Sequence, residues 1–127
     1  MLAELQTIEY QILSETLKDT GIEVFDYIPS DEYRTYVIIG DVKASRYDTK
    51  TTSSYEVISS IYVYAVERSQ IEIKKILQKI HKAMKGLEKQ LNNIYIEYHE
   101  TRTMDSLRID VDLVQGLIEI IYRVEEE

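Results

Sequence analysis

Residues 69–89 constrain the fold most, because their apolar side chains recur at the spacing of a helix with one narrow buried face. Ser69 and Glu72 form the S-x-x-E pattern of a capping box at a helix start. The apolar face consists of Ile73, Ile76, Leu77, Ile80, Ala83, Met84 and Leu87. The opposite side carries Lys74, Lys75, Lys79, Lys82, Lys85 and Lys89. Such a helix packs on a sheet with its lysines outward, and either Gly86 or the pair Asn92 and Asn93 ends it.

Five segments have the composition and alternation of β-strands. They are residues 22–25, 36–42, 55–66, 94–103 and 111–124. The second segment is apolar on both faces, and the third carries no charge beyond Glu56, so we expect both near the middle of the sheet. Pro29 marks a turn, a charged turn is expected over residues 104–110, and Gly116 is either a bulge or a point of tight packing.

A further helix is expected over residues 2–19, where leucines and isoleucines share one broad face and Gly21 follows as the left-handed end residue. The order of elements is therefore α-β-β-β-α-β-β. It predicts an α/β fold of the α+β type, with two helices on a mostly antiparallel or mixed sheet of about five strands. We expect a single domain over residues 1–127 that ends in a short acidic tail at residues 125–127.

Composition limits the functions that the chain can have. Its net charge of -8 disfavours general binding to nucleic acid, which needs a positive surface. The absence of cysteine excludes disulfides, thiol catalysis and cysteine metal sites, and fits a reducing cytoplasm. Neither a secretory signal nor an apolar run of roughly 18 residues is present, so we expect a soluble chain.

No motif for catalysis, cofactor binding or metal binding is found. His81 and His99 lack the spacing of a zinc site. Asp105, Asp110 and Asp112 lie in or beside the predicted charged turn but lack the spacing and glycine of an EF-hand, which favours a solvated turn over the ion site of a small metal-dependent hydrolase. Neither a phosphate-binding glycine loop nor a nucleophile elbow occurs. We therefore expect no enzyme activity, no cofactor and no metal.

The polar connection at residues 43–54 is the first candidate interaction surface. It is long for a turn, and we expect an exposed loop or a projecting hairpin. Lys43, Arg46 and Lys50 surround Tyr47, and cations beside a tyrosine are typical of protein docking surfaces. The alternative is a mobile surface loop without a role.

The lysine side of the helix at residues 69–89 is the second candidate interface, with Lys75, Lys79 and Lys82 at its centre. Like charges on one side of an acidic protein can bind an acidic partner. They can equally serve only to keep the protein soluble.

Four short motifs occur in an order that resembles the tail-completion (tail-to-head joining) proteins of long-tailed phages. They are V-F-D-Y-I-P at residues 24–29, Y-V-I-I-G-D at 36–41, D-T-K-T at 48–51 and T-R-T-M-D at 101–105. The predicted order of helices and strands also matches, so the resemblance covers nearly the whole chain. It implies a fold similar to that of the lambda-type tail terminators.

The resemblance also implies a function. Such a protein is made in the cytoplasm of the bacterial host by a siphophage or prophage and located in the virion tail. It forms a homo-oligomeric ring, typically a hexamer, that caps the head-proximal end of the tail tube and joins it to the head connector. Its partners would be further copies of itself, the tail tube protein and the connector or stopper protein, with DNA passing through unbound and no membrane involved.

Under this interpretation Lys43, Arg46, Tyr47 and Lys50 lie at an assembly interface. The alternative is a non-viral adaptor or regulatory domain that binds an acidic partner through Lys75, Lys79 and Lys82.

Overall fold

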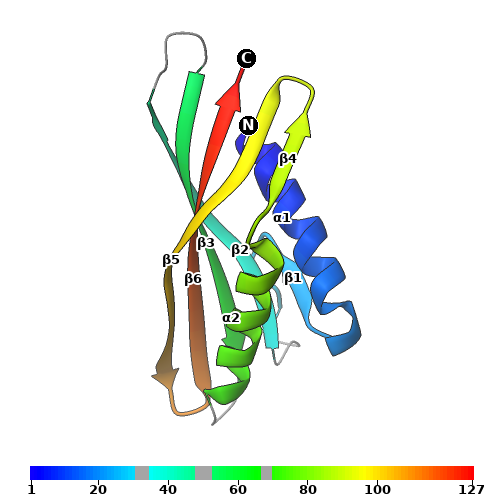
Figure 1. The fold of residues 1–127 in the computed structure, drawn as a ribbon. Helices are drawn as coiled ribbons and strands as arrows, with labels where there is room; N and C mark the ends of the chain where they lie inside the picture. The colour runs from blue at the N-terminus through cyan, green and yellow to red at the C-terminus, as the bar shows by residue number, and fades with distance from the viewer. Residues whose placement is uncertain (31–34, 48–52, 67–69) are drawn as a thin grey trace.

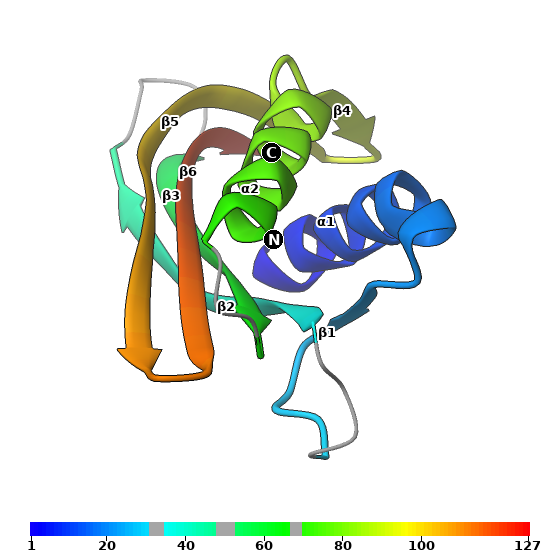
Figure 2. The same cartoon turned by 90° about the horizontal axis from the view of Figure 1, so that it is seen from below.

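The computed structural model describes residues 1–30, 35–47, 53–66 and 70–127, in which two α-helices lie on one face of a six-stranded sheet (Figure 1). The elements in chain order are α1 (Leu2–Leu17), a short 3-10 helix η1 (Lys18–Thr20), β1 (Glu23–Phe25), β2 (Thr35–Arg46), β3 (Ser53–Ala65), α2 (Ile71–Met84), β4 (Glu88–Leu91), β5 (Ile94–Asp110) and β6 (Leu113–Glu126). Figure 2 shows both helices on the same side of the curved sheet. The other face of the sheet carries no described helix.

The strand order across the sheet is β1-β2-β3-β6-β5-β4. β1 runs parallel to β2, and every other neighbouring pair is antiparallel. The predicted α+β class with a mixed sheet is confirmed, with one strand more than expected. β3 lies at the centre, as its uncharged alternation predicted. Within the described residues, neither helix has the length and hydrophobicity that crossing a membrane requires.

The core fills the space between the helices and one face of the sheet. β3 places Val57, Ile61 and Val63 in it, in alternation with half-buried residues on the other face. The buried residues of the two helices are Leu5, Ile8, Glu9, Leu13 and Leu17 of α1 and Ile73, Ile76, Leu77, Ile80 and Met84 of α2. A Cβ added at Gly116 of β6 would lie 2.6 Å from Cγ2 of Ile73, which confirms tight packing at this glycine.

The second helix is shorter than the sequence predicted. It begins at Ile71 with Gln70 as its N-cap, and no side chain caps it. Ser69, the first residue of the expected capping box, lies outside the described residues. The helix ends at Met84, and Gly86 follows with a φ of 82°, so the first of the two predicted ends is confirmed.

The sequence missed β4, which follows this helix. Its first three residues are polar and exposed, Leu91 alone is apolar, and the backbone pairs with Ile94–Glu97 of β5, so no apolar pattern marks it. The prediction that Lys85 and Lys89 lie on the helix is therefore wrong, because Lys85 has an extended backbone and Lys89 lies in β4. Asn92, with a φ of 43°, lies in the turn between β4 and β5.

The predicted charged turn over residues 104–110 is also wrong. β5 continues to Asp110, and the turn occupies only residues 111 and 112. Asp105 pairs with Leu117 in mid-strand and Asp110 with Leu113, so the three aspartates do not share a turn. Backbone pairing with β6 extends the strand here, although neither of its faces is buried deeply.

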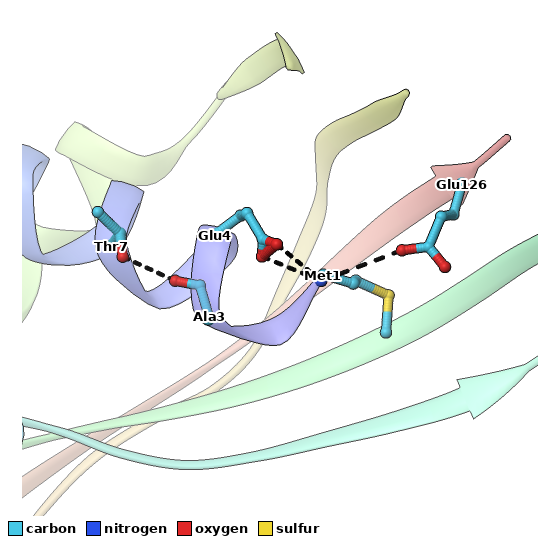
Figure 3. Close-up of polar contacts among 5 residues, drawn as sticks. All are labelled: Met1, Ala3, Glu4, Thr7 and Glu126. Atoms are coloured by element: carbon cyan, nitrogen blue, oxygen red, sulfur yellow. Dashed lines mark hydrogen bonds and ion pairs between the residues drawn. The ribbon is translucent and has the colours of Figure 1, made fainter. Parts of the chain in front are cut away.

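The last residues of the chain are paired with neighbouring strands. Glu125 and Glu126 belong to β6, and the amide of Glu127 donates to the carbonyl of Asn93 at 2.9 Å. The amino group of Met1 donates to the carboxylate of Glu4 at 3.1 Å and lies 4.0 Å from that of Glu126 (Figure 3). The hydrogen bond from the amino group of Met1 lowers the pKa of the Glu4 carboxyl. Both described ends of the chain therefore lie at one end of the sheet.

Candidate assembly surfaces

The β2–β3 end of the sheet carries the residues first predicted to form an interface. The amide of Tyr47 donates to the carbonyl of Ser54 at 2.8 Å, so strand pairing continues to the last described residue of β2 and beyond. The connection is a projecting hairpin, which was the second of the two predicted forms (Figure 1). Lys50 lies outside the described residues.

Strand pairing separates two of these predicted residues. Lys43 is paired with Ile58 and lies on the uncovered face of the sheet, whereas Arg46 is paired with Tyr55, which packs against the core on the helix side. Both are exposed, as is Tyr47, but the two cations point to opposite faces. The hairpin thus presents a charged side on each face rather than a single cluster.

The lysines of α2 share one exposed face of the helix, although fewer lysines belong to this face than the sequence predicted. Lys75, Lys79 and Lys82 are exposed, and their spacing of four and three residues places them on one helix face. Lys75 lies 3.7 Å from the carboxylate of Glu72, an exposed pair of the kind that contributes little to stability.

A row of aromatic rings on the uncovered face of the sheet was not predicted as a site. Its members are Phe25, Tyr27, Tyr36, Tyr62 and Tyr64. The ring centroids of neighbouring members lie 5.4 to 6.3 Å apart, within the range of favourable ring contacts. Only the pairing of β1, β2 and β3 shows that these five rings are adjacent.

The β5–β6 hairpin carries exposed apolar residues at its end. Leu107, Ile109 and Val111, here called the apolar tip, are about half exposed or more, and Met104 lies nearby. These residues alternate with Arg108, Asp110 and Asp112. This period of two was a strand signal that the charges concealed.

A groove lies at the opposite edge of the sheet, between α1 and β1. We call it the edge groove, and its volume is about 630 Å³. Its lining includes Tyr10 of α1, Phe25 of β1 and Tyr27 after β1, and Glu23 and Asp26 add negative charge. Grooves of this size hold several side chains or a small ligand.

The histidines and aspartates weighed as metal ligands make other contacts. Nδ1 of His81 lies 2.8 Å from the hydroxyl of Thr101, and Nε2 of His99 lies 3.4 Å from a guanidinium nitrogen of Arg123. Among the described residues, no three histidine, aspartate or glutamate side chains converge as ligands of a metal ion would.

Glu9 is a buried carboxyl that the sequence did not single out. Its oxygens accept hydrogen bonds from the hydroxyl of Ser59 at 3.0 Å and from that of Tyr122 at 2.8 Å. Burial raises the pKa of Glu9 to about 7, although both hydrogen bonds favour the ionised form. These two hydrogen bonds link α1 to the central strands β3 and β6. The side chain is fully buried, so it is not part of a surface.

Comparison with known families identifies the chain. The family model described as tail completion protein gp17 matches residues 13–125, nearly the whole chain. The chain belongs to this tail completion family. The resemblance inferred from the four sequence motifs is therefore confirmed, and the protein is a structural component of a phage-type virion tail.

A solved structure shows the same fold. A chain in the virion of a native gene transfer agent (GTA) particle superimposes with a TM-score of 0.72 at 18% identity, over 94% of this chain and 91% of that chain. At this identity the match establishes the fold alone. No curated protein matches the sequence significantly.

Proposed function

We propose that this tail completion protein forms a ring on the head-proximal end of the tail tube and joins the tail to the head connector. Family membership supports a role in completing the tail. The observation that carries the proposal is the arrangement of the sheet, whose β2–β3 and β5–β6 hairpins lie at its opposite ends (Figure 1). Each protomer therefore presents two different surfaces, as a protein placed between two partners needs.

The charge of the protein fits a ring through which DNA passes. A net charge of -8 gives the surface no general attraction for phosphates, so DNA can slide without being held. The role is structural rather than catalytic. The ring contacts would be heterologous and closed by rotation, as in the hexamer expected from the resemblance.

In this proposal Lys43, Arg46, Tyr47 and Lys50 mark the hairpin that contacts the tube or the connector, while the lysine face of α2 is a second candidate contact. Exposed cations on both faces of the β2–β3 hairpin favour a polar contact that forms late in assembly. Family membership favours this assembly role over a non-viral adaptor.

Mixing the purified protein with uncapped tail tubes tests the proposal. We expect negative-stain images with a ring at one end of each tube, and such tubes should join to heads in vitro. Binding along the tube wall, at both ends, or to neither end would contradict it. Uncapped tubes incubated with buffer and then with heads are the control, and they should not join.

A further inference from the structure

We propose that neighbouring copies in the ring contact each other by inserting the apolar tip of the β5–β6 hairpin of one copy into the edge groove between α1 and β1 of the next. This inference rests on the proposed ring and specifies its subunit contact. Its grounds are the register of the sheet, the exposure of the tip, the lining of the groove and the charges of both.

The register places the two surfaces at opposite edges of the sheet and at the same level. One row of paired residues runs across five strands and consists of Glu23, Tyr36, Tyr64, Gln115 and Leu107. Its first member borders the edge groove, and its last belongs to the apolar tip. Figures 1 and 2 agree that the hairpin and the α1–β1 side lie on opposite flanks of the molecule. A contact between them is head-to-tail, which is the kind that builds rings.

Both edges are open at this level. β4 pairs only with Ile94–Glu97 of β5, so within the described part of the chain the later residues of β5 have β6 as their one partner strand. β1 is the end strand on the other side. An open strand edge that carries apolar residues is a site where further chains bind unless it is covered.

The tip and the groove match in chemistry. Leu107 is 60% exposed and Val111 is 71% exposed, which is unusual for large apolar side chains unless a partner covers them. The exposed aromatic residues Tyr10 and Tyr27 are part of the groove lining. Aromatic residues of this kind are enriched at the buried centre of protein interfaces.

The charges restrict how the tip can enter the groove. The tip carries Arg108 together with Asp110 and Asp112, and the groove carries the exposed carboxylates of Glu23 and Asp26. The guanidinium of Arg108 donates to the carbonyl of Val111 at 3.0 Å, which holds it beside the apolar tip. The contact therefore requires Arg108 to face Glu23 and Asp26 while Asp110 and Asp112 remain in solvent, and this requirement fixes its register.

Cysteine cross-linking tests the proposal directly, because the natural chain contains no cysteine. The variant L107C/Y27C carries one thiol on the tip and one in the groove, and the matched control L107C/K79C places the second thiol on the exposed face of α2. Both are mixed with tail tubes and treated with a short bis-maleimide. We expect L107C/Y27C to give a ladder of covalent oligomers that ends at the ring size, with at least tenfold more product than the control.

The outcomes separate the contact from the ring. Rings on the tubes with no ladder from L107C/Y27C, or with an equal ladder from the control, would overturn the proposed contact and leave the ring intact. If no rings form even with the unmodified protein, the proposed function fails as well.

A charge exchange gives a second measurement. We expect R108E and E23R each to reduce ring formation at least tenfold, and the double variant to restore it to within threefold of the natural protein.

Discussion

The β2–β3 hairpin and the β5–β6 hairpin project from opposite ends of one sheet, but their outermost residues differ in kind. Toward the end of the first, the described residues include Lys43, Arg46 and Tyr47, which are polar or amphipathic and exposed on both faces. The second ends in the apolar tip of Leu107, Ile109 and Val111. Both hairpins are built by antiparallel backbone pairing, so this difference lies in their side chains.

This difference suggests two kinds of contact. An apolar surface is stable in water only when it is covered for most of the lifetime of the protein, as in a permanent subunit interface. A charged surface remains well solvated by itself and suits a partner that is met later.

The hairpins are also anchored differently. The hydroxyl of Ser106 in β5 donates to the side-chain oxygen of Gln70 at the start of α2, at 2.6 Å.

The largest expected effect comes from making the apolar tip polar. We expect L107D/V111D to weaken ring assembly at least 100-fold, because burial of a leucine or valine side chain contributes about 1.5–3 kcal/mol and two are lost. The fold should be unaffected, since both side chains are exposed in the single chain. Mass photometry of the protein with tail tubes measures assembly, and thermal unfolding checks the fold.

The matched variant at the other hairpin is K43S/Y47S. Its rings should form within about threefold of the natural level, while joining of capped tubes to heads should fall by up to about tenfold, as loss of exposed polar contacts typically produces. If K43S/Y47S loses its rings and L107D/V111D retains them, the assignment of the two hairpins is reversed.

The sequence was most informative where one face of an element is buried. The apolar stripe of α2 and the alternation of β3 exist because one side of each touches the core, and both elements were predicted from this. β4 and the last part of β5 were missed for the opposite reason. Their side chains are mostly exposed, so backbone pairing defines them, and in β5 the alternation of Leu107 and Ile109 with charged residues was interpreted as a turn.

The candidate surfaces were harder to predict because they depend on pairing between distant segments. The register of β2 with β3 shifts between Ile39 and Val42, and counting along the sequence through this irregularity does not give the faces of Lys43 and Arg46. The edge groove requires α1 to lie beside β1, and the aromatic row requires three strands in register. The assembly role was predicted from the motif order, which does not depend on such pairing.

A second effect should weaken both hairpins equally. Glu9 binds Ser59 of β3 and Tyr122 of β6, the central strands from which both hairpins extend. Its pKa is about 7 in the folded chain and 4.5 as an ordinary glutamate, so the folded protein holds the proton more tightly. The stabilisation is complete below pH 4.5 and is lost as the pH rises through 7.

The size of this effect follows from the difference between the two pKa values. About 2.5 pH units correspond to about 3 kcal/mol. The free energy of unfolding is measured in urea for the natural protein and for E9Q. We expect the difference between the two proteins to change by this amount between pH 4 and pH 8, with the natural protein relatively less stable at high pH. The exposed residue Glu15 on the same helix provides the control E15Q, which should show no such change. A constant difference between the natural protein and E9Q would contradict the buried ionisation.

The smallest expected effect compares how firmly the two hairpins are held. Each hairpin contains a glycine that lies close to a neighbouring side chain. A Cβ at Gly116, near the root of the β5–β6 hairpin, would lie 2.6 Å from Cγ2 of Ile73 and 3.3 Å from both methyl groups of Leu77. Both neighbours are buried between α2 and the sheet and have little room to move. A Cβ at Gly40 in β2 would lie 2.5 Å from Cε2 of Tyr62, whose ring is half-buried, and 3.0 Å from the backbone oxygen of Ser60. The ring faces no helix, so we expect it to move aside more readily than Ile73 and Leu77.

G116A should therefore cost about 1–3 kcal/mol through overpacking, whereas G40A should cost less than half of that. Urea unfolding of the two variants measures the difference. In the background of Ile73→Ala, which removes the closest methyl group, the added cost of G116A should fall by more than half, because only the weaker contacts with Leu77 remain. Equal costs for G116A and G40A would show that both hairpins are held equally. A larger cost for G116A means that α2 fixes the β5–β6 hairpin, as a rigid projection that must enter a groove requires.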